Sequence, residues 1–165
     1  MSASFEPGPV DHITVGTVGR PGQRVFFLQV RTAGQTVSFK LEKGQVAALS
    51  VAFSQLLSDL PPTGPLPTDL ELVEPVEPTW VIGAIGLSPY DDRTERLTLM
   101  AEEAVPDGEP DGHTARFELT RAQMAALAQR GRELVEAGRP PCPLCGQPID
   151  PSGHACPRSN GHRAH

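Results

Sequence analysis

Three cysteines and two histidines near the C-terminus are the residues whose types and spacing could do chemistry. Cys142 and Cys145 are separated by two residues in a Cys-Pro-x-Cys-Gly segment. Two thiolates at this spacing can bind one metal ion from a tight turn, and the glycine permits the sharp bend that follows. Cys156 supplies a third sulfur, and His154 or His162 the fourth ligand. The pattern therefore predicts a zinc site of Cys142, Cys145, His154 and Cys156, with His162 as the alternative to His154.

Two other interpretations of this cluster compete with zinc binding. A Cys-x-x-Cys pair also occurs in thioredoxin-like redox sites, but there it begins a helix beside a βαβ unit, whereas here it follows a predicted helix and Arg-Pro-Pro. Three cysteines without metal would leave the proline-rich residues 139–165 with nothing to fold around. A site closed by four protein ligands has no open position for water or substrate, so we expect the zinc to be structural.

The fourth ligand is a choice between the two histidines. His154 is two residues from Cys156, so on an extended segment both side chains point to the same face and can reach one ion. His162 requires a further turn of the chain, although its spacing from Cys156 is also acceptable. We therefore expect His154 to be the ligand.

The rest of the chain contains two blocks that are alike, residues 12–60 and 79–137. Each block shows three strand-like segments followed by a helical pattern. When residues 36–49 are aligned with residues 114–127, seven of the fourteen pairs are identical. This similarity predicts an internal β-β-β-α repeat. Convergence is the alternative, because any junction from strand to helix favours the same residue types.

The strands alternate apolar and polar residues, which is typical of an antiparallel sheet with one face exposed to solvent. Each helix has one apolar stripe that should face a core. Thr120 and Gln123 form a capping box for the second helix, and Glu42 is a weaker cap for the first. The predicted fold class is α+β: two β-β-β-α repeats forming an antiparallel-sheet body with two helices, plus a C-terminal zinc-ribbon-like knuckle.

This organisation gives two domains. Residues 1–138 form the duplicated body, in which a proline-rich connector (residues 61–78) joins the repeats, and residues 139–165 form the knuckle. Two pairs of glycines, Gly16 with Gly19 and Gly83 with Gly86, lie late in strands. Because they do not match a dinucleotide-binding fingerprint, we expect bulges or turns there.

Composition excludes several classes of function. The net charge of −6 and a pI near 5.3 leave no basic surface, so nucleic-acid binding is not expected. No run of residues approaches the roughly 18 apolar residues of a membrane helix, and the first residues do not resemble a signal peptide. We expect a cytoplasmic protein. The chain has no nucleophile elbow, phosphate-binding loop or metalloprotease motif, and His12 and His113 are expected to be exposed beside strand starts.

Several segments resemble an uncharacterised actinobacterial family, domain-of-unknown-function family 3090. They are Val15–Gly22, Leu41–Val46, Gly138–Cys145, Asp150–Cys156 and Arg158–Gly161, of which the tail segments are the most specific. The resemblance implies a protein encoded near a histidine-phosphatase-like protein and a protein distantly similar to phosphoinositide kinases. It thereby implies a protein partner of one of these kinds, and it favours His154 as the fourth ligand.

Two functions follow from these observations. The first is a cytoplasmic, zinc-stabilised adaptor whose sheet body or knuckle binds a protein partner. The alternative is an enzyme of unknown class with a site in the groove between the repeats. A deep cleft lined by convergent polar groups would favour the enzyme, and a flat apolar patch with a polar rim would favour the adaptor.

Overall fold

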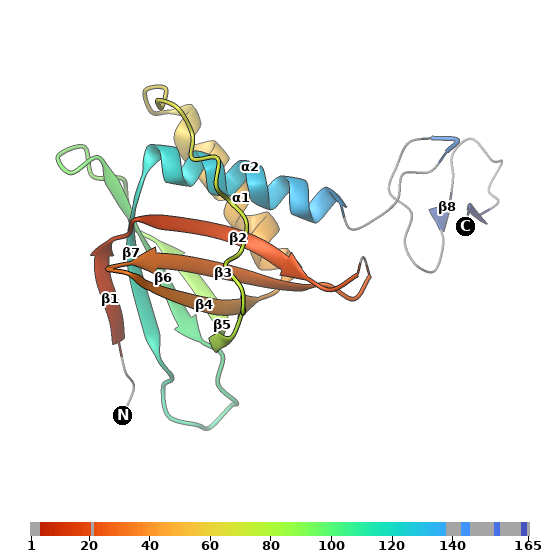
Figure 1. The fold of residues 1–165 in the computed structure, drawn as a ribbon, viewed down its shortest axis with the longest axis horizontal. Coiled ribbons are helices and arrows are strands. Elements are labelled where there is room, and N and C mark those ends of the chain that lie inside the picture. The colour runs from red at the N-terminus through yellow and green to blue at the C-terminus, as the bar shows by residue number, and fades with distance from the viewer. Residues whose placement is uncertain (1–3, 21, 138–142, 146–153, 156–162, 165) are drawn as a thin grey trace.

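The body is built on one seven-stranded sheet with two helices. The computed structural model describes residues 4–20, 22–137, 143–145, 154–155 and 163–164. The strand order is β1-β7-β6-β5-β4-β3-β2 (Figure 1). The elements are β1 (Ser4–Pro9), β2 (His12–Val18), β3 (Val25–Thr32), β4 (Gln35–Leu41), α1 (Lys43–Ser58), β5 (Pro78–Leu87), β6 (Arg96–Glu103), β7 (Thr114–Thr120) and α2 (Arg121–Ala137).

Each half of the body has the element order strand, strand, strand, helix, as predicted. Strands β2, β3 and β4 form one antiparallel meander, and β5, β6 and β7 form another. The prediction of an antiparallel sheet is wrong where the halves meet, because β4 pairs with β5 in parallel. The physical reason is the crossover: α1 and the segment after it carry the chain back to the end of the sheet at which β4 began. The sheet is therefore mixed.

Strand β1 was not predicted. It pairs in parallel with β7, with a bulge between Phe5 and Gly8. Two prolines and a glycine in this short segment argue against a strand by propensity, yet an edge strand tolerates them because only one side of it must be paired. Only Val10 and Asp11 separate β1 at one edge of the sheet from β2 at the other.

This two-residue link is bonded to the strand next to each edge of the sheet. The Val10 N–H points to the carbonyl of Glu118 in β7 (3.4 Å), and the Asp11 N–H donates to the carbonyl of Arg31 in β3 (3.0 Å). The sheet must therefore curl until its two edges almost meet. Figure 1 shows the chain turning from β1 into β2 at this corner.

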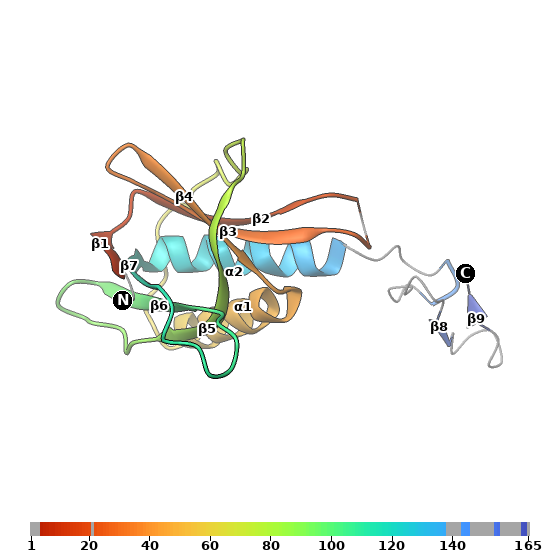
Figure 2. The same ribbon diagram turned by 90° about the horizontal axis from the view of Figure 1, so that it is seen from below.

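Both helices pack on the concave face of the curled sheet and lie side by side (Figure 2). The capping box of α2 is confirmed: the Gln123 N–H donates to the Thr120 hydroxyl (3.2 Å), and the Thr120 N–H donates to Gln123 Oε1 (3.0 Å). The apolar stripes of both helices face the core as expected, with their later residues only partly buried. Residues that form this core include Val46, Leu49, Phe53, Met124, Leu127, Leu28, Phe39, Leu99 and Phe117.

The connector between α1 and β5, residues 59–77, covers part of the opposite face of the sheet. The Thr14 hydroxyl donates to the Leu70 carbonyl (2.7 Å). The Gln29 amide donates to the Val73 carbonyl (3.0 Å), and its oxygen accepts from the Val73 N–H (2.8 Å). Thr14, Gln29 and Ser38 form a buried polar row across β2, β3 and β4. The prediction of a solvent-exposed face is thus wrong for these strands, because the extended connector supplies the hydrogen bonds that water would have made.

The two histidines of the body differ in their exposure. His113 is exposed, whereas His12 is half-buried because its Nε2 lies against the Asp69 carbonyl of the connector. A bulge in β5 between Ile82 and Ala84 confirms the interpretation of Gly83. Neither described helix has the length and apolar character that a membrane crossing requires.

Candidate functional site

The predicted zinc ligands fall at the margin of the described residues. Cys142, Cys156 and His162 lie outside them, as does the side chain of His154. Cys145 is half-buried and ends a turn that begins at Pro143, which is the local structure expected of a knuckle. His154 belongs to a short strand, β8 (His154–Ala155), which pairs antiparallel with β9 (Arg163–Ala164). The backbone at His154 is therefore extended, but the ligand set stays a prediction.

The end of α2, from which the tail continues, is fixed to the sheet. Arg24 follows β2 in the chain, and its guanidinium donates to the Leu134 carbonyl in the last helical turn (2.9 Å). The same guanidinium lies over the ring of Phe26, 5.2 Å from its centroid. A cation at a helix C-terminus satisfies carbonyls that have no partner within the helix and interacts favourably with the helix dipole.

Helix α1 has an unusual exposed surface. Lys43 is the only charged residue among its sixteen, whereas α2 carries five charged residues. Six exposed or half-buried residues in the middle of α1 form an uncharged surface, called here the α1 face: Ala47, Ala48, Val51, Ala52, Ser54 and Gln55. Val51 lies at the centre of the α1 face and is 56% exposed. A surface helix normally presents charged residues to water, so a bare face of this kind is typical of an interaction surface.

A groove runs along each side of the α1 face. The first, about 370 Å³, lies between α1 and α2 and is lined by Ala47, Val51, Ser54 and Val135, with Arg132 and Glu136 at its rim. The second, about 430 Å³, lies between α1 and β5. Its lining is entirely uncharged and includes Ala48, Ala52, Ala84, Ile85 and Leu87.

Backbone geometry explains why both grooves exist. At the first groove, Gly131 of α2 lets the helices approach closely, since a Cβ there would lie 2.3 Å from Ser50 Oγ. At the second, the amide of Gln45 lies near the carbonyls of Ile82 (3.4 Å) and Gly83 (3.3 Å) at the β5 bulge. Small residues on α1 leave both grooves unfilled. The grooves therefore exist because α2 and β5 each approach α1 closely and because the side chains that α1 presents there are short.

An ion pair between Glu103 and His113 was not predicted from the sequence. Glu103, at the end of β6, accepts two hydrogen bonds from His113, one from its backbone N–H (2.8 Å) and one at ring Nδ1 (2.6 Å). These bonds hold the pKa of the Glu103 carboxyl below its usual value, with the backbone bond as the largest cause. Gly112 makes the contact possible, because a Cβ there would lie 2.7 Å from Glu103 Oε2. Ten residues separate the partners, so no local pattern could reveal them.

Among the described residues there is no group of three or more His, Cys, Asp or Glu side chains that could hold a metal ion. The body as described thus offers the histidine–carboxylate pair of His113 and Glu103 and two grooves, one lined by uncharged residues and one bordered by Arg132 and Glu136. Neither arrangement is a catalytic constellation of nucleophile, base and orienting group.

A comparison with known protein families identifies the family of this chain. The family described as "protein of unknown function (DUF3090)" matches residues 5–156. The chain belongs to this family. The match includes the described body from Phe5 onward and extends through Cys142, Cys145, His154 and Cys156, but it ends before His162. No curated protein and no solved structure matches the chain.

Proposed function

We propose that this protein is a cytoplasmic, zinc-stabilised adaptor that binds a protein partner through the α1 face. The observation that carries the proposal is the absence of charge from Gly44 to Ser58 on a surface helix flanked by two open grooves. The molecule as a whole carries a net charge of −6, so this surface is set apart from the rest. An uncharged surface bordered by polar residues is typical of a protein-binding site.

The shape of the surface indicates the chemistry of the partner. Two parallel grooves beside a helix with alanine and serine on its surface match the ridges of a second helix, which pack into such grooves at close interaxial distance. The partner would therefore present the apolar face of an amphipathic helix, with branched side chains near Val51. The family resemblance suggests that a phosphatase-like or kinase-like protein supplies this helix.

The zinc knuckle is proposed as a structural support for residues 139–165. The turn at Pro143–Cys145 and the extended backbone at His154 are both compatible with it. The extent of the family match supports His154, and not His162, as the fourth ligand, since the match contains the four proposed ligands and stops before His162. A metal site of this kind would give a short, proline-rich segment the stability that its few apolar residues cannot.

The internal repeat is proposed on reciprocal contacts between the halves. Gln45 and Gln123 occupy aligned positions, and each accepts a bond from the N–H of its helix cap. The amide of Gln45 then reaches carbonyls of β5, while the amide of Gln123 reaches the carbonyl of Val10 just before β2 (2.9 Å). Gln45 thus bonds to the first strand of the opposite half, and Gln123 bonds to a residue just before it, which supports a pseudo-twofold relationship.

The adaptor proposal is tested by substitution at the centre of the α1 face. Tagged wild-type protein and Val51→Asp are used to capture partners from the native cytoplasm, with and without chelator. Gln129→Asp, an exposed position on α2 outside both grooves, is the matched control. We expect a captured protein that is lost with Val51→Asp, retained with Gln129→Asp, and cross-linked to residues 43–58. Capture that is unaffected by Val51→Asp would contradict the proposal.

A further inference from the structure

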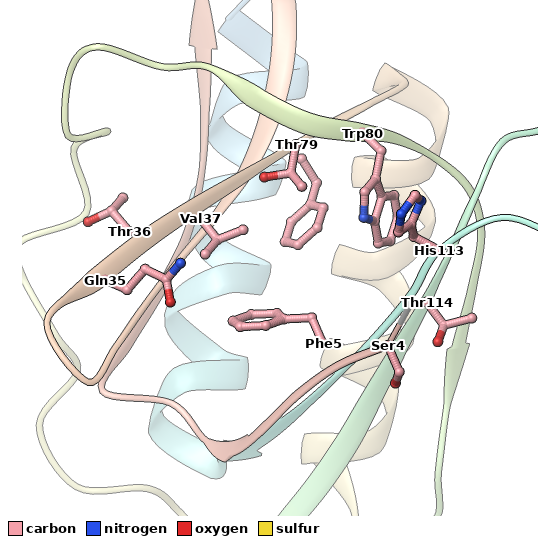
Figure 3. Close-up of a pocket in the computed structure, with 10 residues that line it drawn as sticks. Ser4, Phe5, Gln35, Thr36, Val37, Thr79, Trp80, His113 and Thr114 are labelled. Carbon is pink, nitrogen blue, oxygen red and sulfur yellow. The ribbon is translucent and has the colours of Figure 1, made fainter. Parts of the chain in front are cut away.

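A pocket of about 290 Å³ opens at one end of the curled sheet, on the side of the body where β1 begins (Figure 3). Its walls come from β1, the β3–β4 hairpin, β5 and the start of β7, so both halves of the body contribute. Trp80 and His113 lie on one side of it, Gln35, Thr36 and Val37 on the other, and Phe5 between them. We infer that this pocket binds an uncharged aromatic heterocycle of about purine size.

The apolar part of the lining is aromatic apart from Val37. Phe39 forms part of the floor and is completely buried, and its ring lies 4.6 Å from that of Trp80, edge to face. Phe5 packs edge to face against Phe117 (5.9 Å) and is only half-buried, so part of its ring remains accessible. Rings whose orientation is fixed by their neighbours lose little entropy when a planar ligand packs against them.

The polar part of the lining consists of neutral hydrogen-bonding groups. Besides His113, the polar residues that line it are Ser4, Gln35, Thr36, Thr79 and Thr114, all with uncharged side chains. No Lys or Arg lines the pocket, and the Glu103 carboxylate is hydrogen-bonded to the lining residue His113. A phosphate or carboxylate would find no fixed positive charge here and would lie near a negative one, so an anionic ligand is disfavoured.

His113 gives the pocket its most specific polar group. Its Nδ1 is engaged by Glu103, which fixes the ring orientation and requires the proton to be on Nδ1 when the imidazole is neutral. Nε2 is then an acceptor, suited to a ring N–H or an exocyclic amine of the ligand. The volume lies at the small end of the range for ligand sites, which limits the ligand to a bicyclic ring with few substituents.

The chain itself provides the probe, because Trp80 is its only tryptophan. The full chain is titrated with adenosine, AMP and glucose, and binding is followed by Trp80 fluorescence and by calorimetry. We expect saturable binding of one adenosine per chain, with a dissociation constant of about 1 mM or tighter. AMP should bind several-fold more weakly than adenosine, and glucose should give no saturable response.

Variants locate the site. His113→Ala should weaken adenosine binding about tenfold, the effect of one lost hydrogen bond. Asp107→Asn, on the same loop but outside the lining, should bind like the wild type. If His113→Ala fails to fold, Thr79→Val at the exposed rim serves in its place and should weaken binding several-fold. The inference is overturned by no saturable response to adenosine, by tighter binding of AMP, by equal binding of glucose, or by variants that bind like the wild type.

Discussion

The rings of Phe39 and Phe117 lie 5.8 Å apart, centroid to centroid, and are tilted by 51°. They come from β4 and β7, which are separated in the sheet by two other strands, so the contact exists only because the sheet curls. The two residues also occupy aligned positions in the two halves of the chain. Together with Phe5 and Trp80 they form a continuous row of aromatic contacts from one half to the other.

This contact should couple the stabilities of the two halves. Phe39→Leu and Phe117→Leu each keep most of the buried volume and should lower the free energy of unfolding by about 1 kcal/mol. Either single substitution already removes the aromatic pair. The double variant should therefore lose less unfolding free energy than the sum of the two single losses, by about 0.5–1.5 kcal/mol. Urea unfolding of the four proteins measures this coupling energy, and strict additivity would contradict it.

Gly131 should be required for the close approach of the helices. An added Cβ would meet Ser50 Oγ at 2.3 Å and Val46 Cγ1 at 3.1 Å. We expect Gly131→Ala to destabilise the protein by about 1 kcal/mol, in spite of the higher helix propensity of alanine. In a Ser50→Gly background the same substitution should become neutral or stabilising.

Gly44 provides the matched control for this experiment. It also lies in a helix, but a Cβ there would meet nothing within 4 Å. Gly44→Ala should therefore stabilise the protein by about 0.5–1 kcal/mol through helix propensity alone. Both measurements use the midpoint of thermal or urea unfolding. Stabilisation by Gly131→Ala would show that the helices separate at little cost.

Gln29 should hold the connector on the sheet. Its buried amide makes both hydrogen bonds of the Val73 backbone and a third to Ser38 Oγ (3.1 Å). Gln29→Met keeps the length of the side chain and removes these bonds, so we expect a loss of about 1–3 kcal/mol in unfolding free energy. Limited proteolysis should show faster cleavage within residues 59–77. Gln129→Met, on an exposed face, should change stability by less than about 0.5 kcal/mol.

Glu103 should give the molecule a defined response to acid. Because its pKa is lowered in the folded state from the ordinary 4.5, its bonds to His113 stabilise the fold above that value and are lost as the pH falls through the lowered pKa. Glu103→Gln should thus be less stable than the wild type at pH 7, and the difference should shrink below about pH 4.5. Glu102→Gln, an exposed neighbour, is the control. A difference that is independent of pH would contradict this linkage.

Zinc content tests the knuckle. Protein purified without chelator should contain about one zinc per chain. Cys142→Ser should release the metal and leave the unfolding midpoint of the body unchanged. His154→Ala should lower the zinc affinity by more than the roughly tenfold loss that substitution of an outer-shell residue causes. His162→Ala should lower the zinc affinity far less than His154→Ala does. The reverse order would assign His162 as the ligand.

The sequence predicted elements well where local physics determines them. Alternation predicted the six strands of the two halves, and Thr120 and Gln123 predicted the start of α2 because a capping box is a contact over three residues. What it missed depends on contacts between distant segments. Strand β1 contains prolines and forms only because β7 is available to pair with it. Gln29 is a buried polar residue in β3, and its hydrogen-bond partner, Val73, lies far away in the sequence. The pocket at Trp80 and His113 likewise combines four segments that no spacing connects.

The short link at Val10 and Asp11 has a consequence for the order of folding during synthesis. Strand β1 emerges from the ribosome before the rest of the body, yet its partner β7 follows about a hundred residues later. The β2–β3–β4 meander can form as soon as it is exposed, since its contacts are local, but the segment before it must wait. Until β7 arrives, the inner edge of β1 has no partner within the chain. Closure of the sheet is therefore a late event, and it depends on the last strand of the body.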